Sequence, residues 1–246
     1  MLWGVVGDIH SNVEALDAVL RRLRDAGAEG VICCGDLVGY GTDADAVIER
    51  MASLPRVAAV RGNHDLAVLG RMDLRWFNIP ARAAVERTRR TIKPENLAWL
   101  KELPPRVEDE VFTVVHGSPR NPAEEYLVTT QQFHDNCSYF ETSPCFVGHS
   151  HMPACFLMSE PVSYVEHSPL LDGQTVASPV GVRSVINPGS VGQPRDHDAR
   201  ACYGLYDEET RVFTLHRVEY DVASVQDKIL KAGLPEFLAL RLSYGQ

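Results

Sequence analysis

The first hundred residues alternate short apolar runs with segments in which apolar residues recur every three or four positions. Three apolar runs are typical of buried strands, at residues 2–7, 30–35 and 56–61. Asn12 is a residue type that begins helices, and the apolar stripe behind it predicts a helix that ends at Gly27. Thr42 is the predicted cap of a second helix. This strand–helix–strand order with short links favours a mostly parallel sheet with right-handed crossovers.

The pattern changes after residue 80. Residues 80–103 predict helix with a new start at Pro94, and further helices are predicted at 129–140, 221–232 and after Pro235. Strand patterns now follow one another with few helices between them, at 111–115, 145–147, 154–158, 184–186, 201–206 and 211–217. Residues 160–183, rich in Pro, Ser and Gly, predict a loop or a hairpin excursion. We expect residues 1–246 to form a single domain of two packed sheets with helices outside.

Composition places the chain among folded proteins. Hydrophobic residues make up 45% and charged residues 23%, and no apolar run reaches the roughly 18 residues that a membrane helix needs. Residues 1–7 form an apolar run without a preceding basic region, so they predict a first strand rather than a signal peptide. The cytoplasm is therefore the expected location. The six cysteines form no Cys-x-x-Cys pair and are expected to be reduced.

The net charge of −9 argues against long nucleic acid as a partner, because such binding rests on Lys and Arg contacts to phosphates. It does not argue against a small phosphorylated substrate, since bound metal ions reverse the local field. No membrane partner is expected. A homo-oligomer stays possible.

Five polar clusters stand where predicted strands have just ended. They are Asp8-Ile9-His10, Gly35-Asp36, Gly62-Asn63-His64-Asp65, His116-Gly117 and Gly148-His149-Ser150-His151. The carboxyl ends of the strands in an open α/β sheet form the ligand crevice, so five strands can deliver five clusters to one place. Each cluster alone is a weak signal, but five of the nine histidines lie in them, which favours one shared site.

The donor types predict a catalytic metal site. The candidate ligands are Asp8, His10, Asp36, Asn63, His116, His149 and His151. They supply oxygen and imidazole nitrogen without thiolate, a mix that suits manganese first, with iron, zinc, nickel, cobalt or magnesium as alternatives. Seven ligands are too many for one ion that keeps an open position, whereas two ions about 3.5–4 Å apart use them naturally. Such ions lower the pKa of a bound water and orient it as a nucleophile.

The five clusters, in this order over residues 8–151, resemble the motifs of the calcineurin-like metallophosphoesterases. Residues 187–192, Asn-Pro-Gly-Ser-Val-Gly, are similar to a C-terminal segment of the small bacterial and archaeal phosphodiesterase-like members. The resemblance implies an α/β fold, a four-layer α/β/β/α sandwich of two mixed sheets flanked by helices, with a dinuclear site.

The resemblance also implies how the ligands are shared. Asp8, His10 and His151 would bind the first ion, Asn63, His116 and His149 the second, and Asp36 would bridge them. The chain departs from the protein Ser/Thr phosphatase branch at residues 38–41 and 65–68, where both phosphate-gripping arginines of that branch are missing. Dephosphorylation of proteins is therefore not expected.

Several further residues have two interpretations. His64 is expected to be the general acid for the leaving oxygen, with Asp65 holding or tuning it, largely on the resemblance; alternatively His64 only hydrogen-bonds its loop. Asn12 is either a phosphate contact or a helix cap. Arg195 either reaches the substrate or is a solvated loop residue. Asn63 is a candidate substrate contact as well as a ligand.

The sequence thus predicts a metal-dependent phosphoesterase, acting on diesters of a small organic phosphate or nucleotide. A phosphomonoesterase and a nucleotide pyrophosphatase are the alternatives among enzymes, because they share the metal core and differ in loops. A scaffold with an idle metal site is the non-enzyme alternative. Residues 66–93 and 160–183 are expected to set specificity. The aromatic residues, including Trp76, Phe77 and Trp99, are interpreted as core residues.

Overall fold

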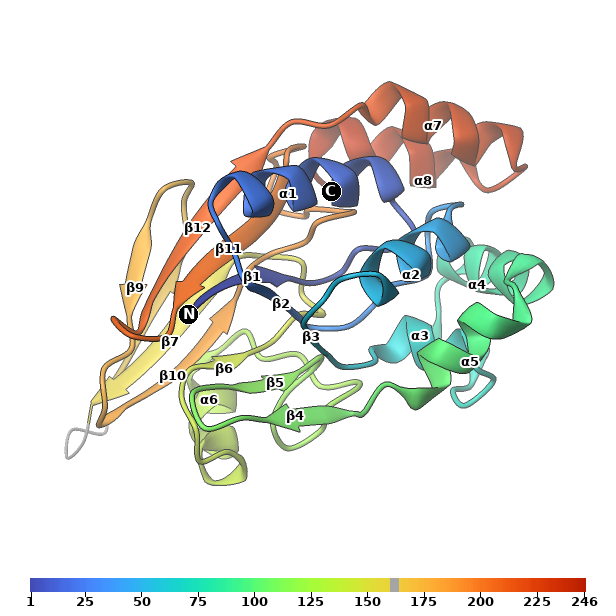
Figure 1. Cartoon of the computed structure of the whole chain (residues 1–246). Helices are drawn as coiled ribbons and strands as arrows, with labels where there is room; N and C mark the ends of the chain where they lie inside the picture. Colours follow the sequence, from blue (N-terminus) through green and yellow to red (C-terminus); the bar gives the residue numbers. More distant parts are fainter. Residues whose placement is uncertain (160–163) are drawn as a thin grey trace.

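The computed structural model describes residues 1–159 and 164–246. Two six-stranded sheets are stacked with helices outside them (Figure 1). The first sheet has the order β3 (Val57–Ala59), β2 (Gly30–Cys33), β1 (Leu2–Val6), β11 (Ala201–Asp207), β12 (Val212–Val218) and β9 (Thr175–Ala177). The second has the order β4 (Arg106–Glu108), β5 (Thr113–Val115), β6 (Cys145–Phe146), β10 (Val182–Asn187), β7 (Ala154–Ser159) and β8 (Val165–Pro169). The implied fold of two mixed sheets flanked by helices is confirmed.

Each sheet contains two parallel and three antiparallel strand pairings. β1, β2 and β3 run parallel, as the strand–helix–strand pattern predicts, whereas β11, β12 and β9 run antiparallel to their neighbours. The expectation of a mostly parallel sheet is therefore wrong for the outer strands. The reason is local: Asp207 accepts hydrogen bonds from the N–H groups of Glu209 and Thr210, which closes a short turn between β11 and β12. A short turn can only join antiparallel strands.

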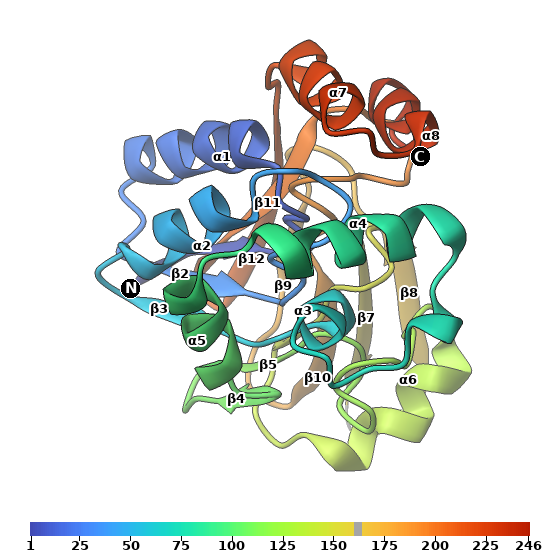
Figure 2. The ribbon, with the colours of Figure 1, turned by 90° about the vertical axis from the view of Figure 1, so that its right-hand side faces the viewer.

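Helices cover both outer faces of the stacked sheets. Figure 2 shows α1 and α2 on the side of the first sheet and α6 on the side of the second. The helices are α1 (Val13–Asp25), α2 (Ala44–Ala52), α3 (Asn63–Val68), α4 (Ile79–Thr91), α5 (Pro94–Glu102), α6 (Thr130–Asn136), α7 (Val222–Lys231) and α8 (Glu236–Leu240). Short 3-10 helices are η1 (Leu74–Trp76), η2 (Cys137–Tyr139) and η3 (Arg241–Tyr244). None of the helices in residues 1–159 and 164–246 combines the length and the hydropathy of a membrane-spanning segment.

The core follows the alternation of side chains along the strands. In β2, Ile32 points between the two sheets, while Val31 and Cys33 pack beneath the helices on the outer face. In the second sheet, Phe146 lies between the sheets and Cys145 packs on the side of α6. Full burial of such a side chain stabilises the fold by about 1.5–3 kcal/mol. The central strands are thus held on both faces, which makes their carboxyl ends rigid supports.

Most predicted elements are confirmed, but three local predictions change. Thr42 does not cap α2, which begins after Asp43; the Thr42 hydroxyl donates to the Asp43 carboxylate instead. The sequence pattern missed α3, because six residues are too few to show a helical period. The predicted excursion at 160–183 contains β8, β9 and the start of β10, and β7 and β8 pair antiparallel. Residues 160–163 of it lie outside the described part of the chain.

Candidate metal centre

The seven predicted ligands meet at one end of the stacked sheets. Asp8 and His10 follow β1, Asp36 follows β2, and Asn63 is the first residue of α3 after β3. The second sheet contributes the remaining three ligands: His116 follows β5, and His149 and His151 follow β6. All are buried except Asn63, which is half-buried. Five of the strand ends thus deliver their polar residues to one cluster.

Two imidazoles in the first half of the cluster face each other. The Nδ1 atom of His10 hydrogen-bonds the carbonyl of Val38 at 3.0 Å, and Nδ1 of His151 hydrogen-bonds the carbonyl of Gln193 at 2.7 Å. A carbonyl only accepts, so each Nδ1 carries the proton and each Nε2 is a lone pair. The two Nε2 atoms lie 3.1 Å apart. Two lone pairs at this distance repel unless a cation sits between them.

The second half of the cluster repeats this arrangement. Nδ1 of His116 hydrogen-bonds the carbonyl of Cys34 at 2.8 Å, and Nε2 of His149 hydrogen-bonds the carbonyl of Glu124 at 3.2 Å. The free nitrogen of His116, Nε2, lies 3.2 Å from Nδ1 of His149 and 3.0 Å from Oδ1 of Asn63. Backbone carbonyls that fix the tautomer of a histidine are the usual outer support of a metal ligand.

The Asp36 carboxylate lies between the two halves. Its Oδ2 atom is 3.7 Å from Nε2 of His10 and 3.4 Å from Nε2 of His116. Asp8 belongs to the first half, with Oδ1 3.5 Å from Nε2 of His151. Ligand atoms of Asp8, His10 and His151 all lie within 4.8 Å of one another. Asp36 belongs to two further groups of this kind, one with His10 and His64 and one with Asp8 and His116.

Burial favours the uncharged forms of the carboxylates and imidazoles in this cluster. It raises the pKa of Asp8 to about 8, and it raises the pKa of Asp36 well above its usual range, with the charges of Asp65 and Asp8 adding to the effect. The same burial lowers the pKa of His149 to about 4 and that of His116 well below the usual range. A divalent cation in the cluster would stabilise the ionised form of these carboxylates, and the neutral imidazoles are ready to bind it.

The backbone at the ligands is in an unusual conformation. Five of them have positive φ: Asp8 (51°), His10 (49°), Asp36 (53°), His149 (68°) and His151 (61°). Residues other than glycine rarely adopt this left-handed region, and each such residue costs on the order of 1–3 kcal/mol. The surrounding hydrogen bonds hold these turns. The turns point the side chains back into the cluster just after each strand ends.

Two glycines leave room for the site. A Cβ atom on Gly62 would overlap the carboxylate of Asp36, and one on Gly39 would overlap the ring of His64. Gly39 also has a φ of +99°, which other residues rarely adopt. The glycines beside the polar clusters are therefore required for close packing at the centre.

His64 lies beside the predicted ligands. Its side chain is buried, and Nδ1 has no hydrogen-bond partner among the described residues. The ring packs edge-on against His10, with centroids 4.8 Å apart, and against Phe77. Burial, with smaller effects of Arg195 and His149, lowers the pKa of His64 to about 3, so the ring is neutral at pH 7. The predicted loop hydrogen bond is absent at Nδ1.

The expectation that Asp65 holds His64 is wrong. Its Oδ1 atom accepts from the N–H of Val38 at 3.1 Å, and Oδ2 accepts from the N–H of Gly62 at 2.8 Å. Asp65 thereby connects the loop that carries Asp36 to the start of α3. The sequence contains one signal for this role, because an acidic residue at the third position of a helix often bonds the backbone before it.

Asn12 and Arg195, two of the predicted substrate contacts, differ in their positions. Asn12 caps α1 by accepting from the N–H of Ala15, and its amide donates to the carbonyl of Gly192 at 3.0 Å. Both polar atoms are used inside the fold and the side chain is buried, so the predicted phosphate contact of Asn12 is wrong. Arg195 is half-buried at the cluster, where it donates to Gln193 and to the hydroxyl of Tyr40.

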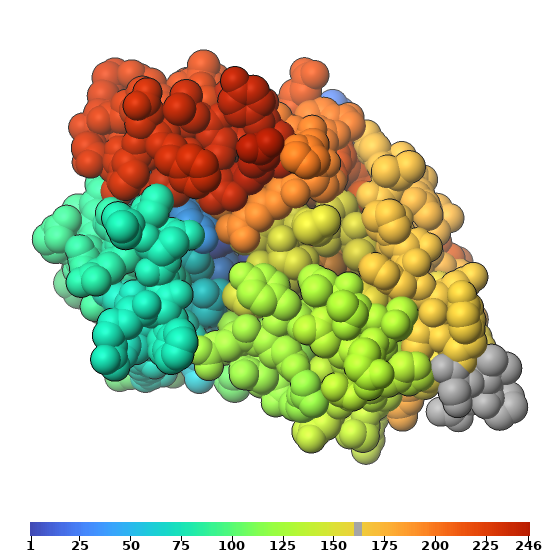
Figure 3. Space-filling view, turned by 180° about the vertical axis from the view of Figure 1, so that it is seen from behind, coloured from blue at the N-terminus to red at the C-terminus, as the bar shows by residue number. Residues whose placement is uncertain are grey.

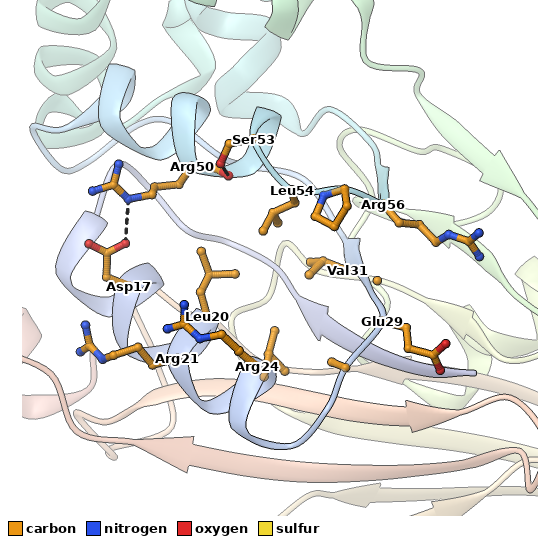
Figure 4. A pocket seen from close by; sticks show the side chains of 14 residues that line it. Asp17, Leu20, Arg21, Arg24, Glu29, Val31, Arg50, Ser53, Leu54 and Arg56 are labelled. Carbon is orange, nitrogen blue, oxygen red and sulfur yellow. Dashed lines mark hydrogen bonds and ion pairs between the residues drawn. The ribbon is translucent and has the colours of Figure 1, made fainter.

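A cavity of about 130 Å³ opens onto the cluster, lined among others by Asp36, Asn63, His64, His149, His151 and Arg195. Figure 3 shows this face hollowed where the segments near residues 75, 125 and 195 approach the N-terminal segment. A larger cavity of about 540 Å³ lies beside α1, where Leu20 and Leu54 point into it and Arg50 pairs with Asp17 (Figure 4). It contains none of the predicted site residues. Donor chemistry rather than size therefore marks the functional site.

Two stacked mixed sheets with carboxylates and imidazoles gathered at their strand ends are the arrangement that the resemblance to the metallophosphoesterases implies. A family model described as "Calcineurin-like phosphoesterase superfamily domain" matches residues 1–211. The chain belongs to this superfamily.

The chain is similar along its whole length to three further proteins. A metallophosphoesterase from Sphaerobacter thermophilus, whose crystal structure is known, is 40% identical with a TM-score of 0.87, over 100% of this chain and 99% of that chain. An uncharacterised protein of Methanocaldococcus jannaschii is 37% identical over 98% of this chain and 97% of that protein. A hypothetical protein from Pyrococcus horikoshii OT3, 24% identical with a TM-score of 0.81 over 100% and 98% of the two chains, has the same fold.

Proposed function

We propose that this protein hydrolyses phosphodiesters with the help of two divalent metal ions. The main support for this proposal is that unprotonated imidazole nitrogens face each other in two pairs, with the Asp36 carboxylate between the pairs. The ions would be held by Asp8, His10 and His151 on one side and by Asn63, His116 and His149 on the other, with Asp36 shared. When bound, such ions polarise phosphoryl oxygens and supply a nucleophile at neutral pH. Manganese is the proposed metal.

Arg195 and His64 are the proposed partners of the substrate. The planar guanidinium of Arg195 lines the cavity, and its shape matches two phosphate oxygens. His64 is proposed to give a proton to the leaving oxygen. Burial keeps the ring neutral without substrate, but a phosphate anion beside the ring favours the protonated imidazole and opposes the effect of burial.

Among the described residues that line the cavity, Arg195 is the one permanently cationic side chain. A diester carries one negative charge at neutral pH, whereas a monoester carries close to two. Bound ions would add positive charge of their own, so the arginine alone does not separate the two classes of ester. The diester is the class that we propose, and the assay below separates it from the monoester. The proposed partner is accordingly a small phosphorylated substrate.

The test compares a diester and a monoester with the same leaving group. The protein is stripped of metal, reconstituted with manganese and analysed for metal per chain, and kcat/KM is measured for both esters. We expect metal-dependent hydrolysis with the larger kcat/KM for the diester. Full metal content without hydrolysis of either ester would instead support a scaffold with an idle metal site. A larger kcat/KM for the monoester would favour the monoesterase.

A further inference from the structure

Two large aromatic side chains stand at the mouth of the site. Trp76 is 82% exposed and Tyr126 is 46% exposed, so the expectation that Trp76 belongs to the core is wrong. Trp99 does pack against the core, as predicted. Water contact of an aromatic ring is unfavourable, and exposed aromatic residues beside a cavity are typical of ligand contacts. We propose that Trp76 and Tyr126 form a stacking site for a planar ring of the substrate, such as a nucleobase; this rests on the proposed phosphoesterase function.

The site consists of two adjoining cavities of different character. The cavity of about 130 Å³ contains the predicted ligands and Arg195. The second, of about 180 Å³, is lined by Met72, Phe77, Glu124, Trp76, Tyr126, Asn63 and His149. Trp76 and Tyr126 line both. Each cavity is smaller than the roughly 300–1,000 Å³ of a site for a whole drug-sized ligand. The phosphate would occupy the first and the ring the second.

Tyr126 connects the ring cavity to the metal centre. Its ring stacks on the imidazole of His149, with centroids 3.9 Å apart and the planes inclined by 20°. Because His149 is a predicted metal ligand, the position of Tyr126 relative to the metals is fixed. Trp76 comes from a different segment, η1, where Asp73 caps the turn by accepting from the N–H of Arg75 at 2.9 Å. The two rings thus come from segments that are far apart in the sequence.

The charge of the second cavity selects against another phosphate. Glu124, an exposed residue, lines it, while Arg195 lines only the first cavity. A carboxylate repels a second phosphate and can accept a hydrogen bond from an N–H group at the edge of a base. The predicted substrate class is therefore a phosphoester with a single phosphate and a neutral planar ring. The prediction that residues 66–93 set specificity agrees with this, since Met72, Trp76 and Phe77 lie there.

Binding without turnover gives a direct test. The metal-loaded protein is titrated by calorimetry with adenosine 5′-monophosphate and with ribose 5-phosphate, which share the phosphate and differ in the base; phosphate release is checked throughout. Stacking of a base contributes roughly 5- to 150-fold in affinity, so the nucleotide should bind tighter by that factor. The nucleotide should also quench tryptophan fluorescence, because Trp3 is buried and Trp76 is the most exposed of the three tryptophans.

Variants assign the effect to the ring. Trp76→Leu should abolish the preference for the nucleotide and Trp76→Phe should keep most of it. Tyr244→Leu, which removes another exposed ring that lines neither cavity, should change nothing. Equal binding of both ligands to the wild type, no binding of the nucleotide, or an unchanged preference in Trp76→Leu would overturn the stacking site. Hydrolysis of an alkyl diester without a ring tests the phosphoesterase function separately, and Tyr244→Leu should leave its kcat/KM unchanged.

Discussion

The Nε2 atoms of His10 and His151 lie 3.1 Å apart, while each ring uses its other nitrogen to hydrogen-bond a backbone carbonyl. The pair therefore presents two lone pairs to the same small space. His116 and His149 repeat the relationship. Such a cluster is stable only if cations occupy it or if protons are rearranged, and this follows from the geometry without reference to any relative.

The first prediction is that the chain binds two ions. Elemental analysis after reconstitution with excess manganese should approach two ions per chain, since the Asp36 carboxylate lies between two pairs of imidazoles. His116→Ala should reduce the content toward one, because it removes a ligand from only one group. An active wild-type protein that holds no more than one ion under saturating metal would contradict dinuclearity.

The second prediction ranks Asp36 above His10. Asp36→Ala removes a carboxylate that lies within 3.7 Å of both imidazole groups, whereas His10→Ala removes one donor from one group. The loss of kcat/KM should be larger for Asp36→Ala, and larger than the roughly 10–100-fold that follows loss of an outer-shell partner. Both are measured with metal in excess. The reverse ranking would mean that the bridging carboxylate is another residue.

The third prediction concerns Asp65 as a positioning residue. Asp65→Asn replaces one of the two carboxylate oxygens by an NH2 group, which cannot accept a hydrogen bond. Either the bond from the N–H of Val38 or the bond from the N–H of Gly62 is therefore lost. Manganese affinity should fall by about 10–100-fold although no ligand is changed. Asp73→Asn, a substitution at an exposed helix cap, serves as the matched control. Unchanged metal affinity in Asp65→Asn would show that the two loops hold their positions without it.

The fourth prediction is that His64 acts on the leaving group. His64→Ala should lower hydrolysis of alkyl diesters by about 10²–10⁴-fold, because an alkoxide needs a proton as its bond to phosphorus breaks. Nitrophenyl diesters, whose leaving group departs largely unaided, should lose much less. Metal content should stay at the wild-type level. Equal losses for both leaving groups with full metal would remove the acid role, and lost metal would make His64 a ligand.

The fifth prediction is a pH dependence of metal affinity. Without metal, the pKa of Asp8 is raised to about 8, so below that pH a proton competes with the metal for this carboxylate. The pKa of His149 is lowered to about 4, so that imidazole is already neutral and adds little competition above pH 5. Manganese affinity should therefore rise by up to about tenfold per pH unit as the pH rises toward 8, and Asp36, whose pKa burial also raises, should add to this rise.

Titrations from about pH 6 to 9 measure this dependence, with Asp8→Asn as the variant that should make its slope smaller. Ordinary histidine ligands would instead release the metal only in the range where imidazoles protonate. An affinity that stays constant above about pH 6.5 would favour that simpler behaviour.

The sequence by itself determined the local elements and the donor set. The apolar runs predict the central strands, and Asn12 and Gly27 mark the ends of the first helix, because capping and side-chain period are properties of neighbouring residues. The polar clusters at strand ends likewise predicted one shared site, since the carboxyl ends of strands meet at one edge of a sheet. These predictions depend only on spacing along the chain.

The tertiary structure decided how those residues are used. Three relationships depend on the paths of loops, which no short pattern in the sequence predicts. They are the hydrogen bond from Val38 to Asp65, the stacking of Tyr126 on His149 and the exposure of Trp76. The positive φ of the ligands is likewise not predictable from the sequence, because Asp and His usually avoid this backbone conformation. Side-chain partners of loops depend on where the packed strands place the loop ends, so only the folded chain determines them.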